Sequence, residues 1–210
     1  MSWLQRLGRS PREEGPGRKE REDGPPEQVR RVSPGLAAFF DGVREGGDHA
    51  VLDMGPAAGA HLSLFSAFAG QVFFGDLLPR PPRGTSLRAA LDAIPGHGRL
   101  PYDLILLWNL FDRVTDDERA AIVDKVTELA APGARLFTVL ESSQAPTTRP
   151  LRFTLDDRTT VAEEPAGPEE PAGPRLLPAE VERLLDPWDV VRAFTVRNGR
   201  REYVAVLEEA

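Results

Sequence analysis

Residues 51–59 read Val-Leu-Asp-Met-Gly-Pro-Ala-Ala-Gly, an apolar run that leads into a turn with two glycines. Gly55 and Gly59 have no Cβ atoms, so a ligand can lie against their main chain. Asp53 ends the apolar run, and its carboxylate would repel the pyrophosphate of a dinucleotide. The turn therefore predicts a nucleotide pocket in a parallel α/β sheet, built for a neutral or cationic ligand.

Helix and strand patterns alternate through the rest of the chain. Ser33-Pro34 is a helix start, and Thr115 with Glu118 has capping-box spacing, which starts another helix. That second helix is expected to end at Pro132-Gly133. The other segments are predicted as helices over 60–69, 87–94 and from 178, and as strands over 50–53, 71–75, 102–108 and 134–140. This order is typical of a parallel sheet with right-handed crossovers.

The C-terminal end departs from that pattern. Asn198-Gly199 is a strong hairpin signal, and it lies between two strands expected over 190–197 and 200–207. A hairpin cannot continue a parallel sheet, so one of the last strands must run antiparallel.

The 53–59 motif and the terminal hairpin together resemble the class I S-adenosylmethionine-dependent methyltransferases. That family has an acid, a glycine and a small-residue loop closed by another glycine after its first strand. Pro56 and Ala57 depart from the usual loop, which makes it stiffer. The resemblance covers about residues 34–210, and it implies a Rossmann-like, doubly wound, mainly parallel sheet with an antiparallel C-terminal strand.

The resemblance is weakest between Asp76 and Tyr102. Family members usually fit a helix, a further strand and an adenine-binding acid into this interval, but here there is room only for a short helix and loops. We therefore expect one outer strand to be missing, and we assign no residue to the adenine amino group.

The resemblance also implies how S-adenosylmethionine would be held. Asp76 ends the second strand, where the family's acid accepts hydrogen bonds from the ribose hydroxyls. Leu77 would pack on the adenine, Asn109 would lie beside the methionine portion, and Asp53 would bind its own turn or the ligand's ammonium through water. The expected cofactor-binding set is Asp53, Gly55, Pro56, Ala57, Gly59, Asp76, Leu77 and Asn109. The alternative is a packing turn with a loop-capping Asp76.

Catalysis of methyl transfer requires little beyond alignment of the nucleophile with the methyl group, so a base is not always needed. Asp112, Glu141 and His61 lie near strand ends or the glycine turn, where they could line the mouth of the site. Surface or capping roles suit them better, and we name no catalytic residue.

Three parts of the chain are predicted from composition. Residues 1–32 are rich in Arg, Glu, Gly and Pro, so we expect a disordered charged tail, followed by one methyltransferase-like domain over 33–210. An insert over 142–175 contains a possible hairpin at 152–161, which could cover the substrate. It also holds EEPAGP twice, over 163–168 and 169–174, which predicts an extended, solvated, acidic spacer.

Composition excludes several classes of function. The chain has no cysteine, and its three histidines have no ligand spacing, so no metal site is expected. Net charge is -7, and residues 34–210 carry eighteen basic against twenty-seven acidic groups, which disfavours nucleic acid as a partner. No membrane span or secretory signal is evident, so a cytoplasmic protein is expected.

These observations favour an S-adenosylmethionine-dependent methyltransferase that acts on an unidentified small-molecule or protein acceptor. The main alternative is a methyltransferase-like binding or scaffold module without catalysis, which the missing strand, Pro56 and the absence of an evident base support. A nicotinamide oxidoreductase is a weaker third hypothesis, because of Asp53 and the terminal hairpin.

Overall fold

The main sheet of the molecule is mostly parallel. The structure is a computed structural model that describes residues 28–78, 86–95, 101–142, 147–197 and 199–208. Within these ranges the sheet has six strands in the order β10-β11-β5-β4-β2-β3. They are β2 His49–Asp53, β3 Ala69–Phe74, β4 Tyr102–Trp108, β5 Ala130–Glu141, β10 Trp188–Thr195 and β11 Arg200–Leu207. Strands β2 to β5 are parallel, and β11 is antiparallel to both β5 and β10. The predicted fold class is confirmed, with β3 at the edge of the described sheet.

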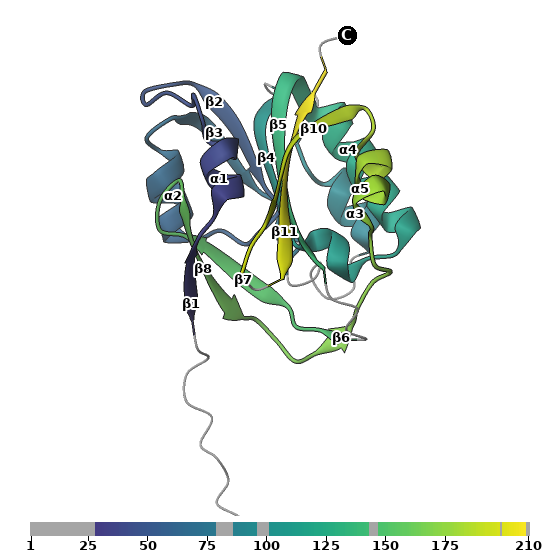
Figure 1. Cartoon of the computed structure of the whole chain (residues 1–210). Coiled ribbons are helices and arrows are strands. Elements are labelled where there is room, and N and C mark those ends of the chain that lie inside the picture. Colours follow the sequence, from purple (N-terminus) through teal and green to yellow (C-terminus); the bar gives the residue numbers. More distant parts are fainter. Residues whose placement is uncertain (1–27, 79–85, 96–100, 143–146, 198, 209–210) are drawn as a thin grey trace, which may run out of the picture.

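Helices cover both faces of this sheet, with α1 and α2 on one side and α3, α4 and α5 on the other (Figure 1). They are α1 Pro34–Phe39, α2 Gly59–Phe65, α3 Leu87–Asp92, the 3-10 helix η1 Leu110–Arg113, α4 Asp116–Leu129 and α5 Pro178–Leu185. No helix in the described ranges is long and apolar enough to cross a membrane. The double cover explains why β4 is apolar from Leu104 to Trp108, since a strand between two helical layers has no solvent-facing side.

Local signals explain most helix boundaries. Ser33 caps α1 by accepting a hydrogen bond from the Leu36 N–H, and the Thr115–Glu118 capping box starts α4. The prediction that Pro132-Gly133 ends that helix is wrong. The helix ends at Leu129, and the pair lies inside β5, where Gly133 has a φ of 75° that a side chain would disfavour.

A second sheet lies across the carboxyl ends of the parallel strands, and we call it the cap sheet. It consists of β1 Val29–Val32, β8 Thr160–Pro165 and β7 Leu151–Leu155, all antiparallel, in the order β1-β8-β7. Its β7–β8 hairpin agrees with the hairpin expected within the insert. A two-stranded sheet of β6 Thr147–Thr148 and β9 Glu170–Pro171 lies beside it.

The cap sheet corrects two predictions from composition. Residues 29–32 are not part of a disordered tail but form β1, because the hairpin offers a free edge to pair with; residues 1–27 lie outside the described residues. The first EEPAGP repeat is not fully solvated, since its Glu163 is only 6 % exposed. Glu163 accepts hydrogen bonds from Arg31 and Arg200, and these ion pairs stabilise the buried charge.

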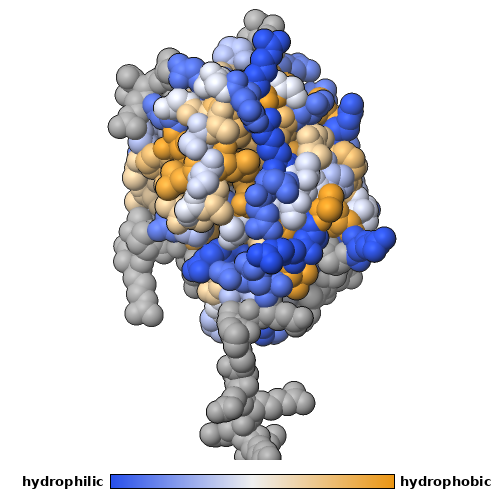
Figure 2. Space-filling view, turned by 90° about the vertical axis from the view of Figure 1, so that its left-hand side faces the viewer, coloured by the Kyte–Doolittle hydropathy of each residue, from blue (hydrophilic) through white to orange (hydrophobic). Residues whose placement is uncertain are grey.

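Glu202 on β11 fastens the cap sheet to the main sheet. Its buried carboxylate accepts hydrogen bonds from Ser33 Oγ at 2.9 Å and the Gly35 N–H at 2.8 Å, and it forms an ion pair with Arg31. Arg31 in turn donates to Glu163 at 2.6 Å, so one guanidinium joins a cap strand to the body. Polar side chains gather at this lower end of the molecule, below a more apolar region (Figure 2).

Gly35 is predicted to tolerate no side chain. A Cβ there would lie 2.7 Å from Glu202 Cβ and 2.9 Å from Phe137 Cε2, so Gly35→Ala should lower the free energy of unfolding by about 1–3 kcal/mol. Gly59→Ala is the matched control, because a Cβ at Gly59 meets no atom within 4 Å. Urea unfolding followed by circular dichroism measures both. Equal effects of the two substitutions would contradict the packing described for Gly35.

Candidate functional site

The glycine turn lies where the sheet reverses its winding. The chain passes from β2 to β3 on one side and then returns to β4 on the other side of β2. Ligands of open α/β sheets bind outside the carboxyl ends of the strands at such a point. Main-chain bonds tie the turn to the loop after β3: Gly75 N–H donates to Asp53 O at 2.7 Å, and Leu77 N–H to Met54 O at 3.0 Å. The turn and the loop therefore form one rigid rim.

Asp53 lies at the centre of this rim and is fully buried. One oxygen, Oδ1, accepts from the Gly55 N–H at 2.8 Å and from Trp108 Nε1 at 2.6 Å. The other, Oδ2, lies 2.8 Å from His61 Nδ1, which must be the donor because a carboxylate only accepts. The expected bond to its own turn is present, and two further side chains complete the shell of the carboxylate.

His61 corrects its predicted surface or capping role. It is only 1 % exposed, because its ring packs between Phe74 and Trp108 at centroid distances of 6.4 and 5.7 Å. Its Nε2 is buried and has no hydrogen-bond partner in the described part of the chain. The spacing of Asp53 to His61, from a strand end into the first helical turn, was the available sequence signal for the pair.

Trp108 fills the space in front of the turn. Its ring stacks on Phe153 of β7 at 4.9 Å and 9°, so the insert covers the end of β4. A Cβ added to Gly55 would lie 3.3 Å from Trp108 Nε1. Trp108 also has a φ of 53°, a strained conformation for a bulky residue, and such strain collects at functional sites.

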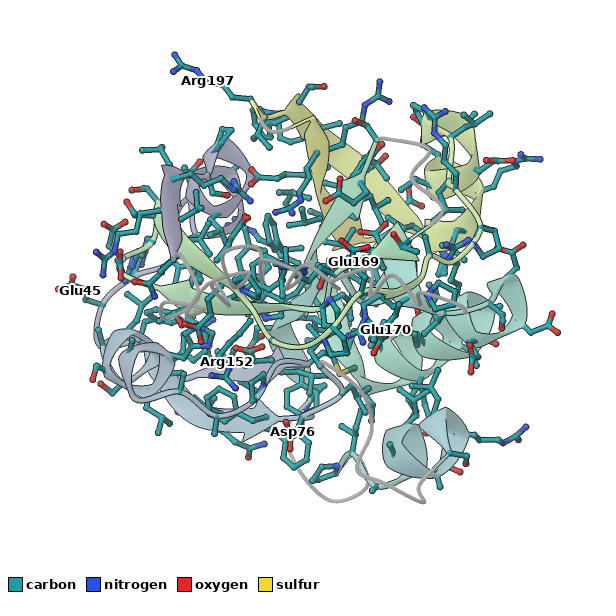
Figure 3. All side chains as sticks on the ribbon, turned by 90° about the horizontal axis from the view of Figure 1, so that it is seen from below. Glu45, Asp76, Arg152, Glu169, Glu170 and Arg197 are labelled. Carbon is teal, nitrogen blue, oxygen red and sulfur yellow. The ribbon has the colours of Figure 1, made fainter. Side chains whose placement is uncertain are left out.

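Asp76 is an exposed member of the predicted cofactor-binding set. It follows β3, is exposed, and has a φ of 49°; its carboxylate forms no ion pair with the described side chains. Figure 3 looks onto this end of the molecule and shows Asp76 at its rim. Gly59 is also open, since a Cβ added there would have no atom within 4 Å.

The remaining predicted residues lie at the same end but differ in access. Ala57 is exposed and Pro56 is half-buried, whereas Leu77 is buried in the core. Asn109 is 3 % exposed, and its Oδ1 has no hydrogen-bond partner within the described ranges. The contact of Leu77 with adenine and that of Asn109 with the methionine portion stay predictions.

Asp112 and Glu141 meet at the ends of β4 and β5. Both Asp112 oxygens accept from the Glu141 N–H, at 3.2 and 3.1 Å, and Arg200 forms an ion pair with Glu141. Burial raises the pKa of Asp112 to about 7, with a smaller upward contribution from the Glu141 charge. Across the described residues, no three histidine or acidic side chains are grouped to hold a metal ion.

Sequence comparison finds no relative: no family model matches the chain, and no curated protein is similar to it. Structural comparison finds methyltransferases. The 1,6-didemethyltoxoflavin-N1-methyltransferase of Burkholderia thailandensis is 15 % identical, with a TM-score of 0.51 over 84 % of this chain and 77 % of that one. A type 11 methyltransferase described as putative, from Sulfolobus solfataricus, is 14 % identical, with a TM-score of 0.48 over 85 % and 94 % of the two chains. The likeness to the first establishes the fold of the class I methyltransferases.

The pKa of Asp112 predicts a pH-dependent stability difference. Its pKa is about 7 in the folded chain against an ordinary 3.8, so the folded state loses stability as the pH rises through that interval. An asparagine at position 112 does not titrate. The free energy of unfolding of Asp112→Asn should therefore rise, relative to that of the natural chain, by about 1–3 kcal/mol between pH 5 and pH 8. Urea unfolding at both pH values measures this. The exposed Asp189→Asn should show no such change, and a constant difference for Asp112→Asn would contradict the assignment.

Proposed function

We propose that this chain is a divergent class I methyltransferase that binds S-adenosylmethionine and transfers its methyl group to a small-molecule or protein acceptor. The observation that carries this proposal is the open carboxylate of Asp76, beside a glycine turn at the point where the winding of the sheet reverses. The fold adds support, since the similar Burkholderia thailandensis enzyme is described with bound S-adenosylhomocysteine and a small-molecule substrate.

The nucleoside end of the cofactor fits the described residues. Asp76 offers two acceptor oxygens to the two ribose hydroxyls, and its carboxylate has no competing side chain among those described. Gly59 leaves the start of α2 open, and Ala57 adds only a methyl group to the loop. These residues, with the main chain of Gly55 and Pro56, would hold the ribose and the adjoining atoms.

The methionine end fits only after Trp108 moves. Its indole lies against Gly55, and Asp53 already accepts three hydrogen bonds, so neither can meet a ligand in this arrangement. We infer that Trp108 leaves Asp53 when the cofactor binds, which also releases its strained backbone. Asn109 then has a free amide oxygen for the ammonium group.

The bound cofactor supplies a methyl group on a sulfonium, which is a good leaving group. The chain has then to align the acceptor and exclude water, a task that suits the insert above Trp108. Asp112 is poised to exchange a proton near neutral pH, because burial raises its pKa to about 7. We assign it no catalytic role.

One observation favours a second function, a binding module without methyl transfer. Trp108 is held on three sides, by Asp53, His61 and Phe153, and this packing resembles a permanent filling of the methionine site. A chain that keeps this packing would bind a nucleoside at most, and would act through its surface.

Loss of the Asp76 carboxylate should weaken cofactor binding. We expect the natural chain to bind S-adenosylhomocysteine, and Asp76→Ala to bind it about 10- to 100-fold more weakly, since hydrogen bonds to a charged group contribute about 1.5–3 kcal/mol. Isothermal titration measures the two dissociation constants. Asp189→Ala, which removes an exposed acid from β10, is the control and should bind normally. Absence of binding by the natural chain would overturn the proposal and favour the binding module.

Fluorescence distinguishes the two functions at Trp108. A Trp3→Phe/Trp188→Phe variant leaves Trp108 as the only tryptophan. If the indole leaves Asp53 and the Phe153 stack, saturating S-adenosylhomocysteine should shift its emission to longer wavelength as the ring meets water. Binding by titration without any change in emission would show that Trp108 stays in place, and the proposed movement would then be wrong.

A further inference from the structure

Arg113, the last residue of η1, is a buried cation with donors that no described residue accepts from. Its side chain is 4 % exposed, and its Nη2 donates to Glu170 of β9 at 2.9 Å. Its Nε and Nη1 are buried and have no acceptor among the described residues. These two nitrogens carry three N–H groups, and buried donors without partners cost free energy unless water or a ligand binds them.

The neighbouring Arg119 shows what a purely structural arginine looks like in this fold. It is 1 % exposed, and all three of its nitrogens donate: Nε and Nη2 to Phe111 O, and Nη1 to Asp116. Its Nη2 also reaches Pro174 O in the insert. Arg119 therefore already fastens the insert to η1, so the open donors of Arg113 are not required for that purpose.

Arg113 lies close in sequence to Asn109, at the methionine end of the proposed site. It lies four residues after Asn109, which follows β4 directly. The insert runs along η1, since the Gly173 N–H donates to Asp112 O at 2.8 Å and Glu170 accepts from Arg113 at 2.9 Å. Figure 3 shows Glu170, its partner, on the same end of the molecule as Asp76.

We propose that Arg113 binds an oxyanion, a carboxylate or a phosphate group, on the molecule that receives the methyl group. The planar guanidinium matches the oxygens of both groups and binds them in pairs of parallel hydrogen bonds. Glu170 accepts a hydrogen bond from Nη2, and Nε and Nη1, which have no acceptor among the described residues, would donate to the ligand. The acceptor role rests on the proposed function, whereas the oxyanion site itself does not.

The test compares anions at constant ionic strength. Sodium phosphate and sodium succinate are titrated against sodium chloride, and the thermal unfolding midpoint is followed for the natural chain, Arg113→Gln, Arg113→Lys and Arg152→Gln. Arg152 is the matched control, because it also pairs with a glutamate of the insert but is half exposed. We expect a saturable rise of the midpoint in the natural chain and in Arg152→Gln, and at least about tenfold weaker binding in Arg113→Gln.

Arg113→Lys keeps the charge and should retain part of the effect, which keeps the test valid if Arg113→Gln does not fold. The anion that binds more tightly identifies the group, phosphate or carboxylate. The proposal is overturned if neither phosphate nor succinate raises the unfolding midpoint of the natural chain beyond the rise with chloride. It is also overturned if Arg113→Gln shows the same rise as the natural chain.

Titration with S-adenosylhomocysteine separates this proposal from the function on which it draws. Arg113→Gln should bind it as the natural chain does, since Arg113 is assigned to the acceptor. Oxyanion binding in a chain that binds no S-adenosylhomocysteine would uphold the site and overturn the methyltransferase.

Discussion

The buried carboxylate of Asp53 is the constraint on which the site end of the molecule depends. A carboxylate buried away from water needs hydrogen bonds on both oxygens, and here the Gly55 N–H, His61 and Trp108 supply them. Those three donors come from the turn, from α2 and from β4. One charge therefore fixes the shape of the turn, the direction of the helix and the position of the ring that lies against Gly55.

Further from the site, ion pairs add to the hydrophobic contacts that link the layers. Arg31 and Arg200 each join two carboxylates, and Glu163 is shared between them. A chain of alternating charges thus runs from β1 through the cap sheet to β11 and β5. Each buried charge has a partner of opposite sign, which is the condition under which such a network is tolerated in an interior.

Local signals in the sequence predicted the sheet, the helix caps and the terminal hairpin, because each depends on residues a few positions apart. The glycine turn was identified from its residue pattern and Asp76 from the family resemblance, and their role in cofactor binding stays a prediction. The cap sheet was not, because β1 pairs with β8 and Arg31 meets Glu163, contacts between residues more than a hundred positions apart. The same reason hid the role of Trp108 and the open donors of Arg113, which depend on side chains from other elements.

The attachment of Glu202 to Ser33 and Gly35 has a consequence for how the chain is made. Domains generally begin to fold during synthesis from the N-terminal side, but β11 leaves the ribosome long after β1 and α1. Ser33 and Gly35 have to wait for it, because they are separated from Glu202 by 169 and 167 positions in the sequence. Because such distant contacts form slowly, the apolar side of α1 would lack its partner β11 until that strand has been made.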